Sequence, residues 1–195
     1  LLQRLAQLEV TQMRRILFII VGLLTVAPSA NAQTTEETID RALTAAPFRA
    51  RDEATVIMWN DDYTYETLKE GTNPLVCYDR SSDPGRPPFA VQCTSLANLD
   101  RVAQSRRFDA ESEDADGVRA MVAAAEENGT RVLPEYGSAF ISMNGRDAAS
   151  ARTHITIAVP GATTESTGLP DNPRSGGAWI MDAGTTTAHI MIPGT

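Results

Sequence analysis

The chain has 195 residues, with 17 basic and 25 acidic side chains and a formal net charge of −8. Such an acidic chain repels phosphate backbones and anionic lipid surfaces. We therefore expect neither nucleic acid nor a membrane surface as its partner. Its two cysteines, Cys77 and Cys93, are too few and too far apart in sequence for a cysteine-based zinc or redox site.

The region that begins at Met13 has the three parts of a secretory signal peptide. Two arginines precede the apolar run 16–26, and a small-residue triplet ends at Ala32. We therefore expect cleavage between Ala32 and Gln33. A retained membrane anchor is the alternative, but a spanning helix needs about 20 apolar residues, and this run has eleven.

Three segments follow from this interpretation. Residues 1–12 lack an initiating methionine and precede an export signal, so we expect a non-native N-terminal extension there. Residues 13–32 are the predicted signal peptide, and residues 33–195 are a single extracytoplasmic domain, periplasmic or secreted, in a bacterial host. Cleavage would remove three arginines and one glutamate, a net charge of +2, and so lower the net charge from −8 to −10. No membrane contact is expected after cleavage.

An oxidising compartment favours a disulfide between Cys77 and Cys93. The residues between them are rich in Pro, Gly, Ser and Asp, so we expect the bridge to close a loop that has no strand pairing of its own. In the chain-entropy model, closing a loop of this size contributes about 3 kcal/mol to stability.

The first predicted element is a short helix. Thr34 and Glu37 have the spacing of a capping box, an apolar stripe follows with helical period, and Pro47 ends the helix. Residues 54–59 then read as a buried strand, and residues 65–79 as a hairpin with its turn near Gly71–Pro74.

Two further helices are predicted in the middle of the chain, one capped by Ser95 and one from about Asp116 to Asn128 with Gly129 after its end. The acidic cluster 109–116 lacks the Gly and Glu of a calcium-binding EF-hand loop, so a solvated linker is the better interpretation. The last third contains four predicted strands, at 138–143, 152–160, 177–184 and 188–194. The expected fold is α+β: a mainly antiparallel sheet with two or three helices packed on one face and a single disulfide.

The candidate catalytic residues are His189, Asp182 and, more weakly, His154. If the last two strands join through residues 184–187, Asp182 lies opposite His189 on the same face of the sheet. A carboxylate beside an imidazole is half of a catalytic triad or an outer-shell metal arrangement, and a cross-strand ion pair is the simpler alternative. No metal or cofactor site is predicted.

The two tryptophans, Trp59 and Trp179, also permit a ligand-binding interpretation. Each lies at one end of a predicted strand, where an aromatic ring commonly fills core or covers a sheet edge. Since no further aromatic residues stand close by in sequence, a carbohydrate-binding platform is the less favoured interpretation.

Two stretches carry a resemblance to known sequences: "GTNPLVC" at 71–77 and the ending "SGGAWIM" and "AHIMIP" at 175–181 and 188–193. With the signal peptide and the early strand "ATVIMW", the chain resembles a family of uncharacterised secreted bacterial proteins. Their ending has Pro where this chain has Ala178, and Pro and Tyr where it has Thr186 and Thr187. The resemblance implies a secreted domain and no established activity, cofactor or site residue.

Three functional hypotheses follow. The first is an exported, non-enzymatic, single-domain module that binds a small molecule or a protein. The second is a hydrolase or metal-dependent enzyme that uses Asp182 and His189. The third is a structural or envelope-stress protein with no small ligand. An enzyme requires a concave site where the histidines meet other polar groups, whereas a binding module requires only a pocket or an exposed apolar patch.

Overall fold

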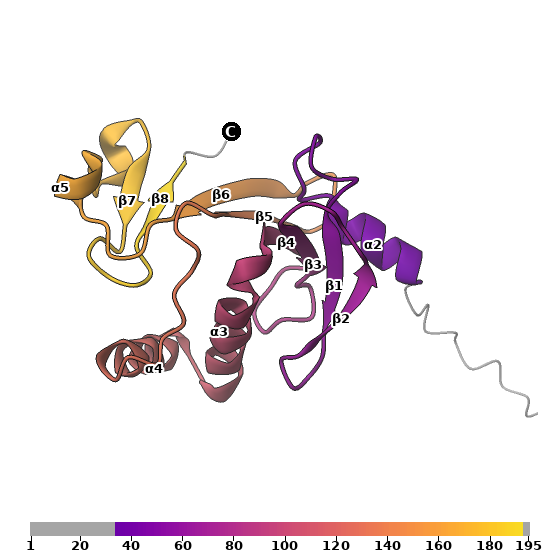
Figure 1. Ribbon diagram of the computed structural model, residues 1–195, viewed down its shortest axis with the longest axis horizontal. Coiled ribbons are helices and arrows are strands. Elements are labelled where there is room, and N and C mark those ends of the chain that lie inside the picture. The colour runs from indigo at the N-terminus through magenta and orange to yellow at the C-terminus, as the bar shows by residue number, and fades with distance from the viewer. Residues whose placement is uncertain (1–33, 193–195) are drawn as a thin grey trace, which may run out of the picture. The chain divides into compact units, whose positions relative to one another are not determined.

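The computed structural model describes residues 34–192 (Figure 1). The predicted extension, the signal peptide and the cleavage site between Ala32 and Gln33 lie outside the described residues. Within residues 34–192, no helix is both long and apolar enough to cross a bilayer.

One eight-stranded sheet organises the domain, with the strand order β2-β1-β3-β4-β5-β6-β8-β7. Neighbouring strands are antiparallel except β1 and β3, which are parallel. The strands are β1 (Thr55–Trp59), β2 (Tyr65–Lys69), β3 (Leu75–Asp79), β4 (Phe89–Ser95), β5 (Ala139–Gly145), β6 (Arg152–Ala158), β7 (Trp179–Met181) and β8 (His189–Met191).

The helices begin where the sequence places capping residues. Thr34 accepts a hydrogen bond from Glu37 N, and the Glu37 side chain accepts one from Thr34 N, so the predicted capping box is present. Ser95 caps a 3₁₀ turn (Leu96–Asn98) that leads into the second predicted helix. The helices are α2 (Thr35–Leu43), α3 (Leu99–Glu111), α4 (Ala115–Glu127) and the single turn α5 (Thr164–Thr167), with a second 3₁₀ turn at Pro173–Ser175.

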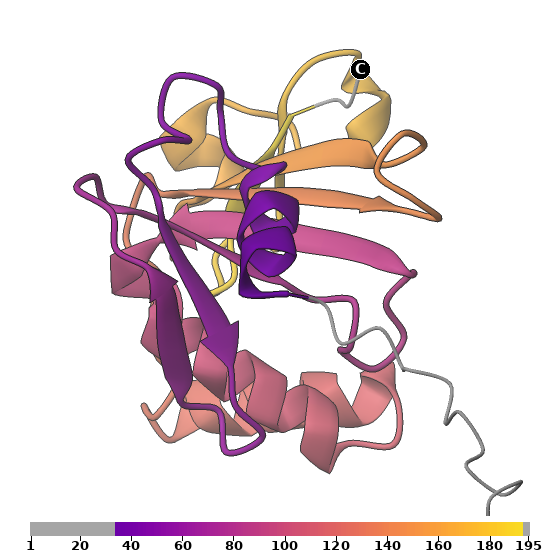
Figure 2. The ribbon, with the colours of Figure 1, turned by 90° about the vertical axis from the view of Figure 1, so that its right-hand side faces the viewer.

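Two apolar layers cover the two faces of the sheet. Val56, Cys77 and Val91 pack under α2 on one face, whereas Ile57 and Tyr78 pack under α3 on the other. Alternate residues of a strand point to opposite faces, so strand β1, apolar from Val56 to Trp59, supplies both layers. Figure 2, in which α2 lies in front of the strands and α3 behind them, shows the same division.

The predicted α+β class, the mainly antiparallel sheet and the single disulfide are confirmed. The structure differs in how the helices are distributed, because α2 and α3 lie on opposite faces rather than together on one face. A helix can cover the second face because strands β1, β3 and β4 carry apolar residues on both sides.

The predicted hairpin over residues 65–79 is wrong. Strands β2 and β3 do not pair with each other; β1 lies between them and pairs with both. The short hairpin is instead β1–β2, closed by a turn in which Asn60 N donates to Thr64 O at 2.8 Å. The most apolar strand thus takes the more central position, where both of its faces are buried.

The disulfide joins Cys77 of β3 to Cys93 of β4, two residues directly opposite each other in the ladder. The expectation of a loop without strand pairing was therefore wrong. Residues 89–95 form a strand in which all but the last residue are buried, so the irregular part is confined to 80–88. Both cysteines are fully buried under α2.

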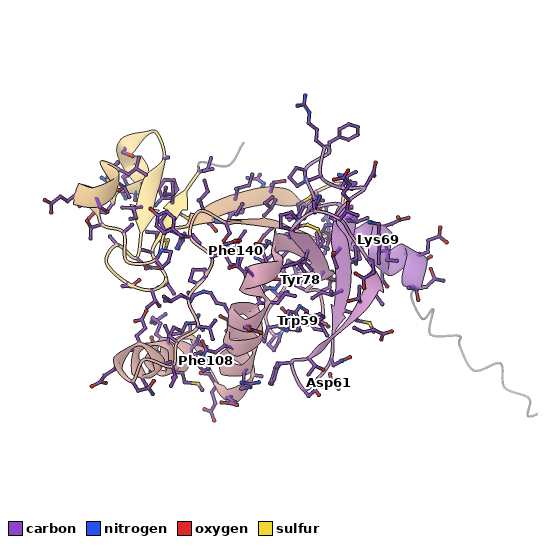
Figure 3. The ribbon with its side chains drawn as sticks, viewed as in Figure 1. Trp59, Asp61, Lys69, Tyr78, Phe108 and Phe140 are labelled. Atoms are coloured by element: carbon purple, nitrogen blue, oxygen red, sulfur yellow. A yellow bond between two sulfur atoms is a disulfide. The ribbon has the colours of Figure 1, made fainter. Side chains whose placement is uncertain are left out.

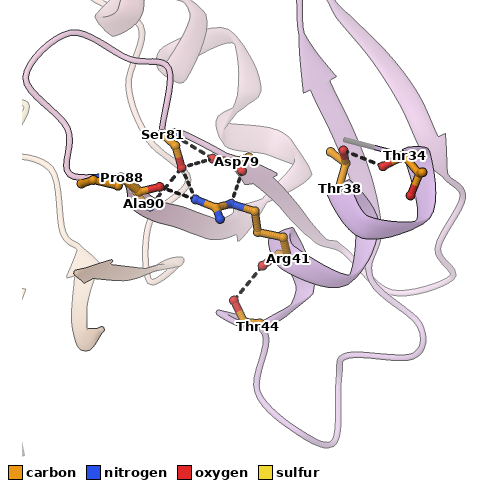
Figure 4. Close-up of polar contacts among 8 residues, drawn as sticks. All are labelled: Thr34, Thr38, Arg41, Thr44, Asp79, Ser81, Pro88 and Ala90. Atoms are coloured by element: carbon orange, nitrogen blue, oxygen red, sulfur yellow. Dashed lines mark hydrogen bonds and ion pairs between the residues drawn. The ribbon is translucent and has the colours of Figure 1, made fainter. Parts of the chain in front are cut away.

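Arg41 fastens α2 to the irregular segment (Figure 4). Its Nε pairs with the carboxylate of Asp79, and its Nη2 donates to Ser81 Oγ at 2.5 Å and to the carbonyl of Pro88 at 2.6 Å. The guanidinium also lies 4.5 Å from the ring centroid of Phe89. One side chain thus ties the first helix to both ends of the β3–β4 connection.

Candidate functional site

A cavity of about 320 Å³ opens on the face of the sheet that α3 covers. Its walls come from four parts of the chain: α3, the segment after α4, strands β5 and β6, and the connection between β7 and β8. This first cavity is lined by Arg101, Ser105, Arg131, Pro134, Phe140, Thr156, Ala158, Asp182, Thr187, Ala188 and His189.

Arg101 reaches the first cavity from α3, one helical turn before Ser105. It is only 7% exposed, and its Nη1 donates a hydrogen bond to Val132 O at 2.5 Å. Burial and, to a smaller extent, the charge of Arg131 lower the pKa of Arg101 to about 10, although Glu126 acts to raise it. Since this pKa remains well above 7, Arg101 is charged at neutral pH.

Arg131 meets α3 from the segment that follows α4. It is 8% exposed, and it donates hydrogen bonds to Gln104 Oε1 at 2.7 Å and to Ser105 Oγ at 3.0 Å. Its guanidinium lies 5.4 Å from the ring centroid of Phe108, which Figure 3 labels on α3. Burial lowers the pKa of Arg131, and its Nε has no hydrogen-bond partner among residues 34–192.

No carboxylate of the described chain forms an ion pair with Arg101 or Arg131. Buried charges in proteins are normally paired, because an uncompensated charge pays a large desolvation cost. The nearby Glu126 is engaged elsewhere: its Oε1 accepts hydrogen bonds from the backbone N and the hydroxyl of Thr186. The first cavity therefore carries two positive charges that hydrogen bonds to neutral groups hold in place, and one carboxylate, that of Asp182.

His189 and Asp182 line the same cavity from the β7–β8 connection. His189 Nδ1 lies 2.7 Å from Thr187 O and 3.9 Å from Asp182 Oδ2. Because a carbonyl can only accept, Nδ1 is the donor, and Nε2 carries the lone pair of the neutral ring. The carbonyl of Thr187, rather than the carboxylate of Asp182, therefore orients this imidazole.

The predicted register of the last two strands is off by one residue. His189 pairs with Met181, and Asp182 lies just beyond the end of β7. Asp182 has a φ of 55°, in the left-handed region that few non-glycine residues adopt. This turn takes Asp182 out of the ladder, although its side chain stays near His189.

His154 is remote from the first cavity. It lies opposite Ser142 in the β5–β6 ladder, whereas His189 lies opposite Ala158. Four residues of β6 separate these positions, or about 13 Å at the usual rise along a strand. The fold does not bring the two histidines together, and residues 34–192 contain no group of three His, Cys, Asp or Glu side chains placed to hold a metal ion.

Sequence reasoning missed Arg101 and Arg131. A signal was present on α3, because Arg101, Gln104 and Ser105 follow each other with helical spacing and form a polar stripe beside the apolar one. Which segment covers that stripe depends on how the chain returns after α4. The hydrogen bond from Arg101 to Val132 O joins residues 31 positions apart, so local sequence patterns do not predict it.

In comparisons with known proteins, no family model, no curated protein and no solved structure matches the chain.

Proposed function

We propose that this protein is an exported, non-enzymatic module that binds a small organic anion, a carboxylate or a phosphate ester, in the first cavity. One observation carries the proposal: Arg101 and Arg131 are both buried, both line the cavity, and neither is paired with a carboxylate of residues 34–192. Guanidinium groups match carboxylate and phosphate geometry, because their planar array of N–H donors can bond two oxygens at once.

The other lining groups suit a small, hydroxylated ligand. Ser105, Thr156 and Thr187 supply hydroxyl groups, whereas Phe140 and Pro134 supply apolar surface. A cavity of about 320 Å³ lies at the small end of the range that ligand pockets occupy, about 300–1,000 Å³. A metabolite fits this volume better than a peptide segment does.

Export remains part of the proposal. The buried disulfide supports it, since such bonds persist in oxidising compartments outside the cytoplasm. The resemblance to secreted proteins of unknown activity is likewise a prediction and assigns no ligand.

The alternative is a hydrolase that uses Asp182 and His189. It is favoured by the position of His189 in the same cavity, with its Nδ1 proton committed to Thr187 O and its Nε2 available as a base. In that case the two arginines would stabilise a developing oxyanion. Turnover of any anionic ester by the wild-type protein, lost in His189→Gln, would favour this alternative.

A thermal-unfolding screen tests the binding proposal. Small carboxylates, sugar phosphates and inorganic phosphate are compared with matched neutral compounds and with chloride at equal ionic strength. A ligand present at 100 times its dissociation constant stabilises the folded state by about 2.7 kcal/mol. We expect at least one organic anion to raise the melting temperature, with no response in Arg101→Gln.

Two control variants separate binding from folding. Arg152→Gln changes an exposed arginine on β6, and Arg41→Gln changes a half-buried arginine on the other face of the sheet. Both should keep the ligand response, even though Arg41→Gln lowers the baseline melting temperature. Absence of any response across the anion panel, or an equal response in Arg101→Gln, would contradict the proposal.

A further inference from the structure

A second cavity, of about 260 Å³, lies against the part of α3 that follows Ser105. None of its lining residues lines the first cavity. Three segments far apart in sequence form it: the turn between β1 and β2, the β3–β4 connection, and α3. Its lining includes Trp59, Asp61, Tyr63, Asp83, Arg106 and Asp109.

Trp59 lies at the centre of an aromatic cluster at this cavity. The ring centroids of Tyr65 and Tyr78 each lie 5.7 Å from its own, both in edge-on geometry, and the guanidinium of Arg106 lies 5.3 Å from it. Figure 3 shows Trp59 and Tyr78 between α3 and the sheet, with Asp61 at the nearby β1–β2 turn. These contacts restrict the motion of the indole before any ligand arrives, which lowers the entropic cost of binding.

The indole Nε1–H of Trp59 has no hydrogen-bond partner among residues 34–192, although it is buried. Buried tryptophan N–H groups usually find a partner, so an unsatisfied one beside a cavity requires an explanation. A ligand or water molecule that enters the cavity can supply the missing acceptor after a small movement of the ring.

The charges around the second cavity are nearly balanced. Asp83 is 7% exposed and pairs with Arg80 Nε at 2.9 Å and with Arg106 Nη1 at 2.6 Å. Burial and the like charge of Arg80 lower the pKa of Arg86, while Asp83 and Asp109 raise it, so Arg86 lies in the field of both carboxylates. The cavity therefore has no strong preference for an anion or for a cation, in contrast to the first cavity.

An organic cation is further disfavoured because guanidinium groups already lie over the aromatic rings. Arg106 is placed against Trp59, and Arg107 lies 5.2 Å from the ring centroid of Tyr63. A second cation would meet like charge there. A neutral ligand with apolar C–H faces and many hydroxyl groups meets no such repulsion.

We propose that the second cavity binds a neutral saccharide unit. Arg106 and Arg107 each cover one face of the rings of Trp59 and Tyr63, so the C–H face of a sugar would pack on the opposite face of one of these rings. Asp61 and Asp109 are exposed carboxylates that make no ion pair within the described chain, and each can accept hydrogen bonds from two hydroxyl groups. The aromatic neighbours that the sequence did not place beside Trp59 are therefore supplied by the fold.

The indole proton of Trp59 provides the test. Two-dimensional ¹H–¹⁵N spectra of the full chain contain two indole signals, and the variant Trp179→Phe identifies the signal of Trp59. Glucose, galactose, N-acetylglucosamine and their β-linked disaccharides are titrated in turn. We expect at least one to shift the Trp59 signal to saturation, with a dissociation constant of about 1 mM, a weak affinity.

Matched variants on α3 decide whether the carboxylates take part. Asp109→Ala should weaken saccharide binding about tenfold, as loss of hydrogen bonds to a charged acceptor does. Glu111→Ala, which removes an exposed carboxylate two residues away and outside the cavity, should leave the affinity unchanged. Arg101→Gln, in the first cavity, should also leave it unchanged, so this test can succeed or fail independently of the proposed anion binding.

Three results would overturn the saccharide site. One is a Trp59 signal that no sugar moves. The second is a signal that tetramethylammonium or inorganic phosphate moves to saturation while the sugars do not. The third is an affinity that Asp109→Ala and Glu111→Ala change by the same factor.

Discussion

Gly71 occupies a position that admits no side chain. A Cβ atom built there would lie 2.3 Å from Glu53 O and 2.4 Å from Thr55 N, both backbone atoms. The next two backbone N–H groups, of Thr72 and Asn73, donate to the same carbonyl of Glu53 at 2.8 and 3.1 Å. The "GTN" stretch thus holds the connection between β2 and β3 against the segment that leads into β1, so we interpret it as structural rather than as a ligand-binding motif.

We therefore predict that Gly71→Ala destabilises the domain by at least about 2 kcal/mol, because the backbone must move to relieve the overlap. Urea unfolding followed by tryptophan fluorescence measures this change. Gly177→Ala is the matched control, since its Cβ would meet no atom within 4 Å; it should stay within about 0.5 kcal/mol of the wild type. Equal stability of the two variants would show that the close approach is not present in solution.

The chemistry of single residues was only partly predictable from sequence. The proximity of Asp182 and His189 follows from two short apolar strands joined by a Gly-containing turn, and the structure keeps it despite the shifted register. The buried pair Arg101 and Arg131 could not be predicted, because arginine is normally a surface residue. Only the packing of a distant segment onto α3 makes these two arginines interior.

At the scale of elements, local signals located the helices well. The capping box at Thr34 and Glu37 predicts the start of α2, and helical spacing predicts both ends of α4 nearly to the residue, whereas α2 ends at Leu43, before the predicted end at Pro47. Pairing of strands was harder to predict. Strands β2 and β3 are adjacent in sequence and separated by five residues, yet β1 lies between them, since pairing depends on which strand can be buried on both faces.

The attachment of α2 to the sheet depends on Arg41. Its ion pair with Asp79 and its bonds to Ser81 and Pro88 are half-buried, so we expect Arg41→Ala to lower the free energy of unfolding by about 1–2 kcal/mol. Chemical denaturation measures the loss, and Arg49→Ala, which changes an exposed arginine six residues past the end of α2, is the control. If both variants unfold at the same denaturant concentration, the Arg41 contacts contribute nothing measurable.

At the scale of the whole molecule, the disulfide staples two central strands of the sheet beneath α2. In the chain-entropy model, a bridge that spans 16 residues stabilises the folded state by about 3 kcal/mol. The double variant Cys77→Ala/Cys93→Ala should therefore unfold at a clearly lower temperature in calorimetry. An unchanged melting temperature would mean that the strand ladder alone supplies the stability of this region.

Helix α3 also links the two cavities, because it forms a wall of each. Its Arg101 and Ser105 face the first cavity, and its Arg106 and Asp109 face the second. The domain thus presents a cavity with two buried arginines and a nearly neutral aromatic cavity along one helix. Such a pair suits a binding module, and the arginines of the first cavity are the feature on which the account depends.

Isothermal titration calorimetry with the organic anion that most stabilises the wild-type protein measures most directly whether anion binding depends on Arg101. For Arg101→Gln, the account predicts an affinity at least about tenfold weaker than that of the wild type, together with an unchanged affinity for Arg152→Gln. The same affinity in Arg101→Gln and in the wild type, with both proteins folded, would contradict it.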